Sequence, residues 1–243
     1  MRRLEGARFG LGGYRHRVIE SLRNTGIHYS RVSNLISLFL SIKLRRRASR
    51  IGDRGAIILD AGCGPGDLTI ELLNGSSGTY IICLDAEYGL IHMLRDRLGD
   101  GGRVDLVVGV FEERYFRDSV FNYIFTSFSI RDSINMVKAL SNFNRYLRHR
   151  GIYVNIDVGR PDNPFIWLLF RLYLRYIVPL IASIYTRSLR NPWGVIIDTV
   201  ERLPTNNSLS MILERIFGSV DMHSYILGCM LITEAIKSSG PNP

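Results

Sequence analysis

Short apolar runs alternate with helical patterns from residue 56 to residue 158, and this alternation limits the fold more than any other feature of the chain. The runs are continuously hydrophobic over five to nine residues, as expected of strands buried on both faces of a parallel sheet. Helices between them would cover those two faces. We predict strands at 56–60, 79–85, 104–110, 120–128 and 151–158, and helices at 67–73, 90–98 and 134–147.

The segments on either side of this core carry further elements. Residues 14–50 have a helical pattern, and HSYILGCMLITEA near the C-terminus indicates two strands around a tight turn. We therefore predict a single α/β domain with a seven-stranded, mostly parallel sheet and helices on both faces. The expected parts are an N-terminal helical lid at 1–50, a ligand-binding core at 51–160, and substrate-covering helices with the final strands at 161–243.

A glycine-rich loop, LDAGCGPGDL, follows the first predicted strand. Its spacing is G-x-G-x-G, through Gly62, Gly64 and Gly66, whereas dinucleotide-binding loops have G-x-G-x-x-G. Asp67 takes the place of the third glycine of that pattern, and Asp60 precedes the loop. Two carboxylates would repel a pyrophosphate but suit a ligand with cationic groups, such as the ammonium and sulfonium of S-adenosylmethionine.

Several side chains fall at or near the carboxyl ends of the predicted strands, where ligands of parallel sheets bind. They are Asp60, Asp85, Val110, Ser127 and Asp157, and we expect them to meet at one rim. Asp85 lies nineteen residues after Gly66, where an acidic side chain can accept both ribose hydroxyls of an adenosine group. A helix-capping role for Asp85 is the alternative.

Composition limits the binding partners and the cellular compartment that we expect for this protein. The chain has a net charge of +9, and only three of its 31 basic residues are lysine. A basic surface attracts nucleic acid or anionic lipid, but no aromatic-interleaved basic stripe of the kind that stacks bases is present, so nucleic acid is disfavoured. Three well-separated cysteines and five histidines without ligand spacing predict no disulfide framework and no metal site. We expect a cytoplasmic protein, since the N-terminus lacks the apolar segment of a secretory signal.

One long apolar segment, 164–185, resembles a membrane span in length. It contains Arg171 and Arg175, four residues apart, and Pro179. Because a charged residue at the bilayer centre costs at least ~2.5 kcal/mol, two on one helix face argue against a spanning helix. We predict a helix that lies on an anionic membrane surface or covers an apolar pocket, with an ordinary core-facing helix as the alternative.

Motifs along most of the chain resemble the UbiE/MenG-type C-methyltransferases of ubiquinone and menaquinone biosynthesis. The glycine loop resembles the first motif of that family, and FTSFSIRD, from Phe125 to Asp132, resembles its S-F-G-L-R-N segment. The segment from Lys138 to Pro161 resembles K-A-L-x-E-x-x-R-V-L-K-P-G-G-x-L-x-x-L-E-F-S-x-P. Further matches, in the family's order, are IHYSRVSNLISLFLSIKLRRR upstream and WGVIIDTVERLP and LGCMLI downstream.

The resemblance implies a Rossmann-like class I methyltransferase fold with S-adenosylmethionine as cofactor. It implies C-methylation of an isoprenoid-tailed quinol precursor, and it leaves the oligomeric state open. The implied cofactor contacts are the glycine loop around Pro65, together with Asp85, Val110, Phe111 and Ser127. The chain has Val110 where the family has an aspartate, and a valine cannot accept a hydrogen bond from the adenine amino group.

Arg131 and Asp132 are the candidate catalytic residues, since they follow the fourth predicted strand, where the transferable methyl group is expected. A guanidinium favours the phenolate form of a dihydroxy aromatic, and the phenolate is a carbon nucleophile. Asp132, an asparagine in the family, could accept the ring proton or could simply pair with Arg131. An RNA or other small-molecule methyltransferase and a degenerate lipid- or partner-binding protein are the alternative functions.

Overall fold

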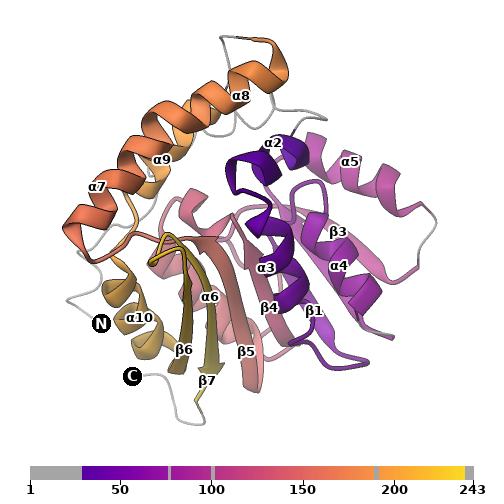
Figure 1. Ribbon diagram of the computed structural model, residues 1–243. Helices are drawn as coiled ribbons and strands as arrows, with labels where there is room; N and C mark the ends of the chain where they lie inside the picture. The colour runs from indigo at the N-terminus through magenta and orange to yellow at the C-terminus, as the bar shows by residue number, and fades with distance from the viewer. Residues whose placement is uncertain (1–28, 76–77, 100–101, 189–191, 239–243) are drawn as a thin grey trace.

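The computed structural model describes residues 29–75, 78–99, 102–188 and 192–238. Its strands form one seven-stranded sheet in the order β3-β2-β1-β4-β5-β7-β6 (Figure 1). Only β7 runs against the others within the described part of the chain, so the predicted mostly parallel sheet is confirmed. The strands are β1 (Ile57–Ala61), β2 (Tyr80–Asp85), β3 (Val104–Val108), β4 (Phe121–Ser127), β5 (Leu147–Val158), β6 (Gly218–Tyr225) and β7 (Met230–Lys237).

Helices pack on both faces of this sheet, as the alternating pattern predicted. Ile58 and Phe125 belong to the core on one face of the sheet, together with residues of helices α3, α4 and α5. Their neighbours in the chain, Leu59 and Ile124, belong to the core on the other face, together with residues of α6, α8, α9 and α10. This side-to-side alternation is the two-residue period of a strand buried on both faces. The helices are α2 (Tyr29–Ile36), α3 (Leu40–Ala48), α4 (Asp67–Gly75), α5 (Tyr88–Leu98), α6 (Met136–Tyr146), α7 (Pro164–Leu172), α8 (Val178–Thr186), α9 (Val195–Val200) and α10 (Asn206–Phe217).

The described part of the expected helical lid consists of two helices. These are α2 and α3, separated by Leu38 and Phe39, whose φ angles are 51° and 60°. Left-handed backbone at two successive residues ends a right-handed helix, so the chain turns between α2 and α3. The part of the prediction at 14–28 lies outside the described residues.

Other boundaries differ from the predicted ones by a few residues. β3 ends at Val108, two residues before Val110, and β5 begins at Leu147 because a register shift between Phe121 and Tyr123 accommodates extra residues of β5. The helices α9 and α10 lie in the segment where helices were expected without stated bounds. These differences leave the strand order and the carboxyl-end rim unchanged.

The long apolar segment is helical throughout, from Pro164 to Thr186, with a π-helical turn at Tyr173–Ile177 between α7 and α8. The wider turn comes just before Pro179, whose ring lacks an N–H and crowds the carbonyl of Arg175 in a regular helix. The combined helix runs along the upper edge of the molecule, above the carboxyl ends of the strands (Figure 1).

Candidate active site

The glycine loop turns tightly between β1 and α4, and its glycines serve different purposes. Gly62 has φ +76°, and a Cβ there would lie 2.3 Å from Cβ of Ser129, so the close approach requires glycine. At Gly64 (φ +53°) a Cβ would meet no atom within 4 Å. The backbone at Gly64 therefore faces open space, as a loop that receives a ligand must.

Asp85, at the end of β2, holds this loop in place. Its Oδ2 accepts a hydrogen bond from the Gly64 N–H, and its Oδ1 accepts one from the Glu87 N–H, both at 2.9 Å. The capping residue of α5 is Glu87, so the alternative of Asp85 as a helix cap is not what the structure shows. Burial raises the pKa of Asp85, and the two backbone hydrogen bonds oppose that rise.

Asp60 and Asp67 flank the loop but differ in their surroundings. Asp60 is fully buried, with Oδ2 accepting from the Thr69 hydroxyl at 2.7 Å and Oδ1 receiving no hydrogen bond from the described residues. Burial raises its pKa to about 7, against the hydrogen bond from Thr69. Asp67 accepts from the Ser30 hydroxyl at 2.9 Å and from Arg97 at 3.0 Å, and Arg97 also donates to the Pro65 carbonyl oxygen at 2.6 Å.

We expect Asp60→Asn to stabilise the cofactor-free protein at pH 8 by on the order of 2 to 4 kcal/mol, and by much less at pH 5. The folded-state pKa of Asp60, about 7, lies above its unfolded value near 3.8. A carboxyl group with a raised pKa favours folding at low pH, and this contribution is lost as the pH rises toward 7. Thermal unfolding at the two pH values measures the difference between variant and wild type. Asp96→Asn, at an exposed position, is the control, and a destabilised Asp60→Asn at pH 8 would contradict this account.

Val110 and Phe111 lie just past the end of β3, beside the same loop. The Phe111 ring is 3.0 Å from the position that a Cβ on Gly62 would take, and it packs edge-on against Phe143. The Val110 N–H donates to the Tyr115 hydroxyl at 3.1 Å. The apolar ring of Phe111 therefore forms one wall next to the loop.

Arg45, which the sequence analysis did not single out, connects the lid to the cofactor side of the rim. It projects from α3, is 5% exposed, and donates from Nε to the Ser127 hydroxyl at 3.0 Å. Its Nη1 lies 3.5 Å from Oδ2 of Asp67, and its guanidinium stacks over Phe128. Buried positions on α3 recur at 41, 44, 45 and 48, and this helical spacing was the signal that could have separated Arg45 from its solvated neighbours.

The two candidate catalytic residues lie together in a short 3₁₀ turn after β4, Ile130–Asp132. Arg131 is 9% exposed, and its guanidinium forms a hydrogen-bonded ion pair with Asp157 on β5. Its Nε is 3.7 Å from Oδ1 of Asp132. Burial raises the pKa of Asp132 to about 6, although Arg131 opposes the rise. Burial raises the pKa of Asp157 as well, again against the effect of Arg131. One guanidinium thus lies between the buried carboxyl group of Asp157 and the partly buried one of Asp132.

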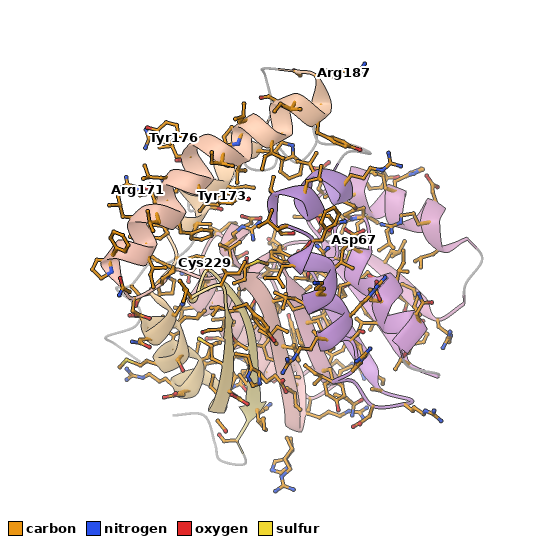
Figure 2. The ribbon with its side chains drawn as sticks, in the orientation of Figure 1. Asp67, Arg171, Tyr173, Tyr176, Arg187 and Cys229 are labelled. Carbon is orange, nitrogen blue, oxygen red and sulfur yellow. The ribbon has the colours of Figure 1, made fainter. Side chains whose placement is uncertain are left out.

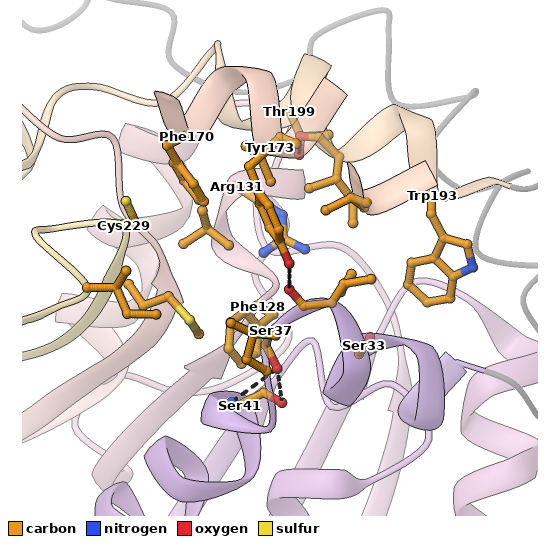
Figure 3. A pocket seen from close by; sticks show the side chains of 18 of the residues that line it. Ser33, Ser37, Ser41, Phe128, Arg131, Phe170, Tyr173, Trp193, Thr199 and Cys229 are labelled. Carbon is orange, nitrogen blue, oxygen red and sulfur yellow. Dashed lines mark hydrogen bonds between the residues drawn. The ribbon is translucent and has the colours of Figure 1, made fainter. Parts of the chain in front are cut away.

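A cavity of about 530 Å³ adjoins this cluster (Figure 3). Arg131, Asp132 and Phe128 form its inner wall, and the lid, α7–α8, α9 and the β6–β7 turn enclose the rest. Tyr173 joins two of these parts, since its hydroxyl donates to the Ile36 carbonyl oxygen at 2.6 Å. The walls are mainly apolar, so the cavity suits a largely hydrophobic molecule with a polar end at Arg131.

The predicted cofactor residues and the cavity occupy adjacent parts of one rim. Gly62–Asp67, Asp85, Val110–Phe111 and Ser127 follow β1, β2, β3 and β4, whereas the cavity lies beyond β4, β5 and the β6–β7 turn. Because β4 is flanked by β1 and β5, a ligand on the glycine loop and a second one in the cavity would meet near the end of β4. Within the described residues, no three His, Cys, Asp or Glu side chains gather as metal ligands.

Comparison with known proteins decides the family. A model of the ubiE/COQ5 methyltransferase family matches residues 14–237. The chain belongs to this family. It is a methyltransferase, and its cofactor is S-adenosylmethionine.

Individual relatives are distant but cover most of the chain. A demethylmenaquinone methyltransferase of Leptospira interrogans is 27% identical over 187 residues, 75% of each chain, and one of Staphylococcus aureus is 28% identical over 177 residues, 71% of this chain and 72% of its own. Among solved structures, a putative S-adenosyl-L-methionine-dependent methyltransferase of Methanococcus maripaludis superposes with a TM-score of 0.61. It is 17% identical and covers 92% of this chain and 94% of its own. The Rossmann-like methyltransferase fold predicted from the sequence is thereby confirmed.

The residues of this rim fit the cofactor. The buried Oδ1 of Asp60 is an acceptor without a hydrogen-bond donor among the described residues, and it lies beneath a loop that opens at Gly64. An ammonium group can supply the missing positive charge, and it would lower the pKa of Asp60. We therefore assign the methionine end to Asp60 and the loop, the ribose to Asp85 and the adenine to Phe111, as proposals.

Proposed function

We propose that this methyltransferase adds a methyl group to a ring carbon of an isoprenoid-tailed quinol, a precursor in menaquinone- or ubiquinone-type quinone biosynthesis. The observation that carries the proposal is the cavity of about 530 Å³, whose walls are mainly apolar and whose charged lining residues, Arg131 and Asp132, lie together at the inner wall. An isoprenoid tail needs apolar walls, and a quinol head needs a group that stabilises negative oxygen. The names of the two relatives, demethylmenaquinone methyltransferases, support the same substrate class.

Arg131 would act on the quinol head. A hydroxyl of the ring becomes strongly electron-donating to the ring carbons when it ionises, and the guanidinium at the cavity wall favours that ionised form. The Asp157 and Asp132 carboxyl groups hold the guanidinium in place from two sides. When bound, S-adenosylmethionine would supply an electrophilic methyl group: the ring carbon would provide the electron pair for the new bond, and the pair of the broken sulfur–carbon bond would stay on the sulfur of the leaving thioether, S-adenosylhomocysteine.

Asp132 would complete the reaction by accepting a proton. After the new carbon–carbon bond forms, the substituted ring carbon must lose its hydrogen as a proton, and the electron pair of that C–H bond restores the aromatic ring. A carboxylate whose pKa is raised to about 6 by burial is a stronger base than an exposed one and is still largely ionised at pH 7. Asp132 lines the cavity directly, so the proton has a short path.

Mass spectrometry of the quinone pool tests the proposal in cells. Cells that lack this chain should accumulate a quinone that is lighter by one methylene, and restoring the chain should return the methylated form. The matched control restores Arg131→Met, which should leave the lighter quinone in place. An unchanged quinone pool in the deletion strain would contradict the proposal and favour another acceptor.

A further inference from the structure

The outer side of the α7–α8 helix is apolar and exposed. Eight large hydrophobic side chains, each between 43% and 71% exposed, recur along it mostly at steps of three or four residues: Phe165, Leu168, Leu169, Leu172, Tyr176, Ile177, Leu180 and Ile184. The opposite side packs on the domain through Leu174, Val178 and Ala182, which are buried. Figure 2 shows Tyr176 on the outer side of this helix. The helix is therefore fixed to the domain by one side while the other faces solvent.

Two turns from distant parts of the chain extend this exposed surface. Leu38 and Phe39, between α2 and α3, are 68% and 53% exposed, and Ile226 and Leu227, between β6 and β7, are 54% and 75% exposed. All four have positive φ, between 46° and 60°, a conformation that is especially unfavourable for a β-branched residue such as Ile226. The fold thus holds large apolar side chains outward at two strained turns.

The exposed residues also surround the opening of the cavity. Leu38, Phe165, Leu169, Ile226 and Leu227 are all more than half exposed and all line the cavity that contains Arg131. They come from the lid, from α7 and from the β6–β7 turn. We call the eight exposed side chains of α7–α8, together with the four residues of the two turns, the apolar face. This face is continuous with the cavity wall.

The charges on this helix indicate which kind of partner can bind to the apolar face. Residues 164–188 contain three arginines and no acidic residue, and the whole chain carries +9. Arg171 pairs with Glu201 at 2.5 Å, whereas Arg175 and Arg187 are exposed. A second copy would bring the same arginines to the contact and would also carry +9, but an anionic lipid surface complements both the arginines and the apolar side chains.

We propose that the apolar face docks on an anionic membrane with the α7–α8 helix in the plane of the interface, so that the cavity opens directly into lipid. Among the described helices, Pro164–Thr186 is long and apolar enough to span a bilayer, but its buried stripe and its Tyr173 hydrogen bond to Ile36 tie it to the domain. The observations that support the docking surface do not depend on the proposed function. The use of this surface as the route by which a quinol reaches Arg131 rests on the proposed function.

Vesicle flotation of the full chain tests the docking surface without any methyl transfer. The wild type should float with phosphatidylglycerol vesicles, should float poorly with phosphatidylcholine vesicles, and should lose binding in high salt. The double variant Leu168→Gln, Ile184→Gln should bind roughly tenfold more weakly or worse, since it removes two side chains that would enter the bilayer without touching the cavity. Arg175→Gln should also weaken binding.

Two matched controls change exposed side chains that are not part of the face. Met211→Gln changes a side chain of α10 that is 69% exposed, and Arg148→Gln changes an exposed arginine at the opposite, amino end of β5; both should bind like the wild type. Circular dichroism and cofactor affinity verify that each variant is folded. Equal vesicle binding by the face variants and the controls would overturn the proposal. The proposal would also be overturned if the wild type did not bind vesicles but dimerised through this face. It would be overturned, too, if only detergent released the wild type from membranes.

The link to substrate supply has its own readout. The Leu168→Gln, Ile184→Gln variant should methylate a long-tailed quinol in vesicles more slowly than the wild type, yet methylate a short-tailed quinol in solution at the same rate. Loss of vesicle binding with equal rates on both substrates would refute the supply route and leave the docking surface standing. Absence of transfer to either quinol by the wild type would refute the proposed function instead.

Discussion

Replacing Arg131 with methionine is expected to lower the rate of methyl transfer ~100-fold or more while leaving S-adenosylmethionine affinity nearly unchanged. The guanidinium lines the substrate cavity, and the predicted cofactor residues lie on the neighbouring strands, so its charge matters when the ring oxygen becomes negative. Methionine keeps much of the aliphatic bulk and removes the charge. Single-turnover transfer to a demethylated quinol, together with calorimetric cofactor affinity, measures both quantities.

The ion pair with Asp157 requires a control, because removing Arg131 leaves a buried carboxylate without its partner. Arg131→Met combined with Asp157→Asn removes that unpaired charge, and the double variant should regain stability without regaining activity. Arg131→Lys keeps the charge and should retain more activity than Arg131→Met. A near-wild-type rate in a folded Arg131→Met variant would rule out a catalytic role for this residue.

Replacing Asp85 with alanine is expected to weaken S-adenosylmethionine binding by ~2 kcal/mol or more, about thirtyfold. The carboxylate closes the glycine loop through the Gly64 N–H and, in our assignment, accepts hydrogen bonds from the ribose. Calorimetry on the folded variant gives the affinity. Asp96→Ala removes an exposed carboxylate from the neighbouring helix α5 and should bind the cofactor like the wild type. Unchanged affinity in Asp85→Ala would show that Asp85 does not contact the cofactor.

The fold followed from local patterns because the chain obeys them almost everywhere. Continuous hydrophobic runs indicated strands buried on both faces, and Ile58 and Leu59 do point into opposite cores. The break at Leu38 and Phe39 could not be predicted, since neither residue type favours positive φ. Local backbone hydrogen bonds close this turn, among them one from the Phe39 N–H to the Asn34 carbonyl oxygen at 2.7 Å. The helix α10 has a helical pattern, since its buried residues Leu209, Ile212, Leu213 and Phe217 recur at steps of three or four after the N-capping Thr205, so its bounds could have been predicted from the sequence.

The parts of the candidate site whose residues fall in one motif or at the ends of predicted strands could be predicted from the sequence. The parts that form where distant segments of the chain meet could not. Asp85 and the glycine loop could be placed together because strand ends share one edge of a parallel sheet. Asp157 was expected at the rim, but its ion pair with Arg131 depends on the pairing of β4 with β5. The hydrogen bond from Tyr173 to Ile36 joins residues 137 positions apart, so neither it nor the cavity it helps enclose can be predicted from local sequence.

Transfer of a labelled methyl group from S-adenosylmethionine to demethylmenaquinol in phosphatidylglycerol vesicles tests the central claim most directly. We expect the purified wild type to give one product in which the label is on a ring carbon, and Arg131→Met to form it ~100-fold more slowly or worse. A wild type that binds S-adenosylmethionine but labels an oxygen of the quinol, or labels RNA and no quinol, would contradict the account.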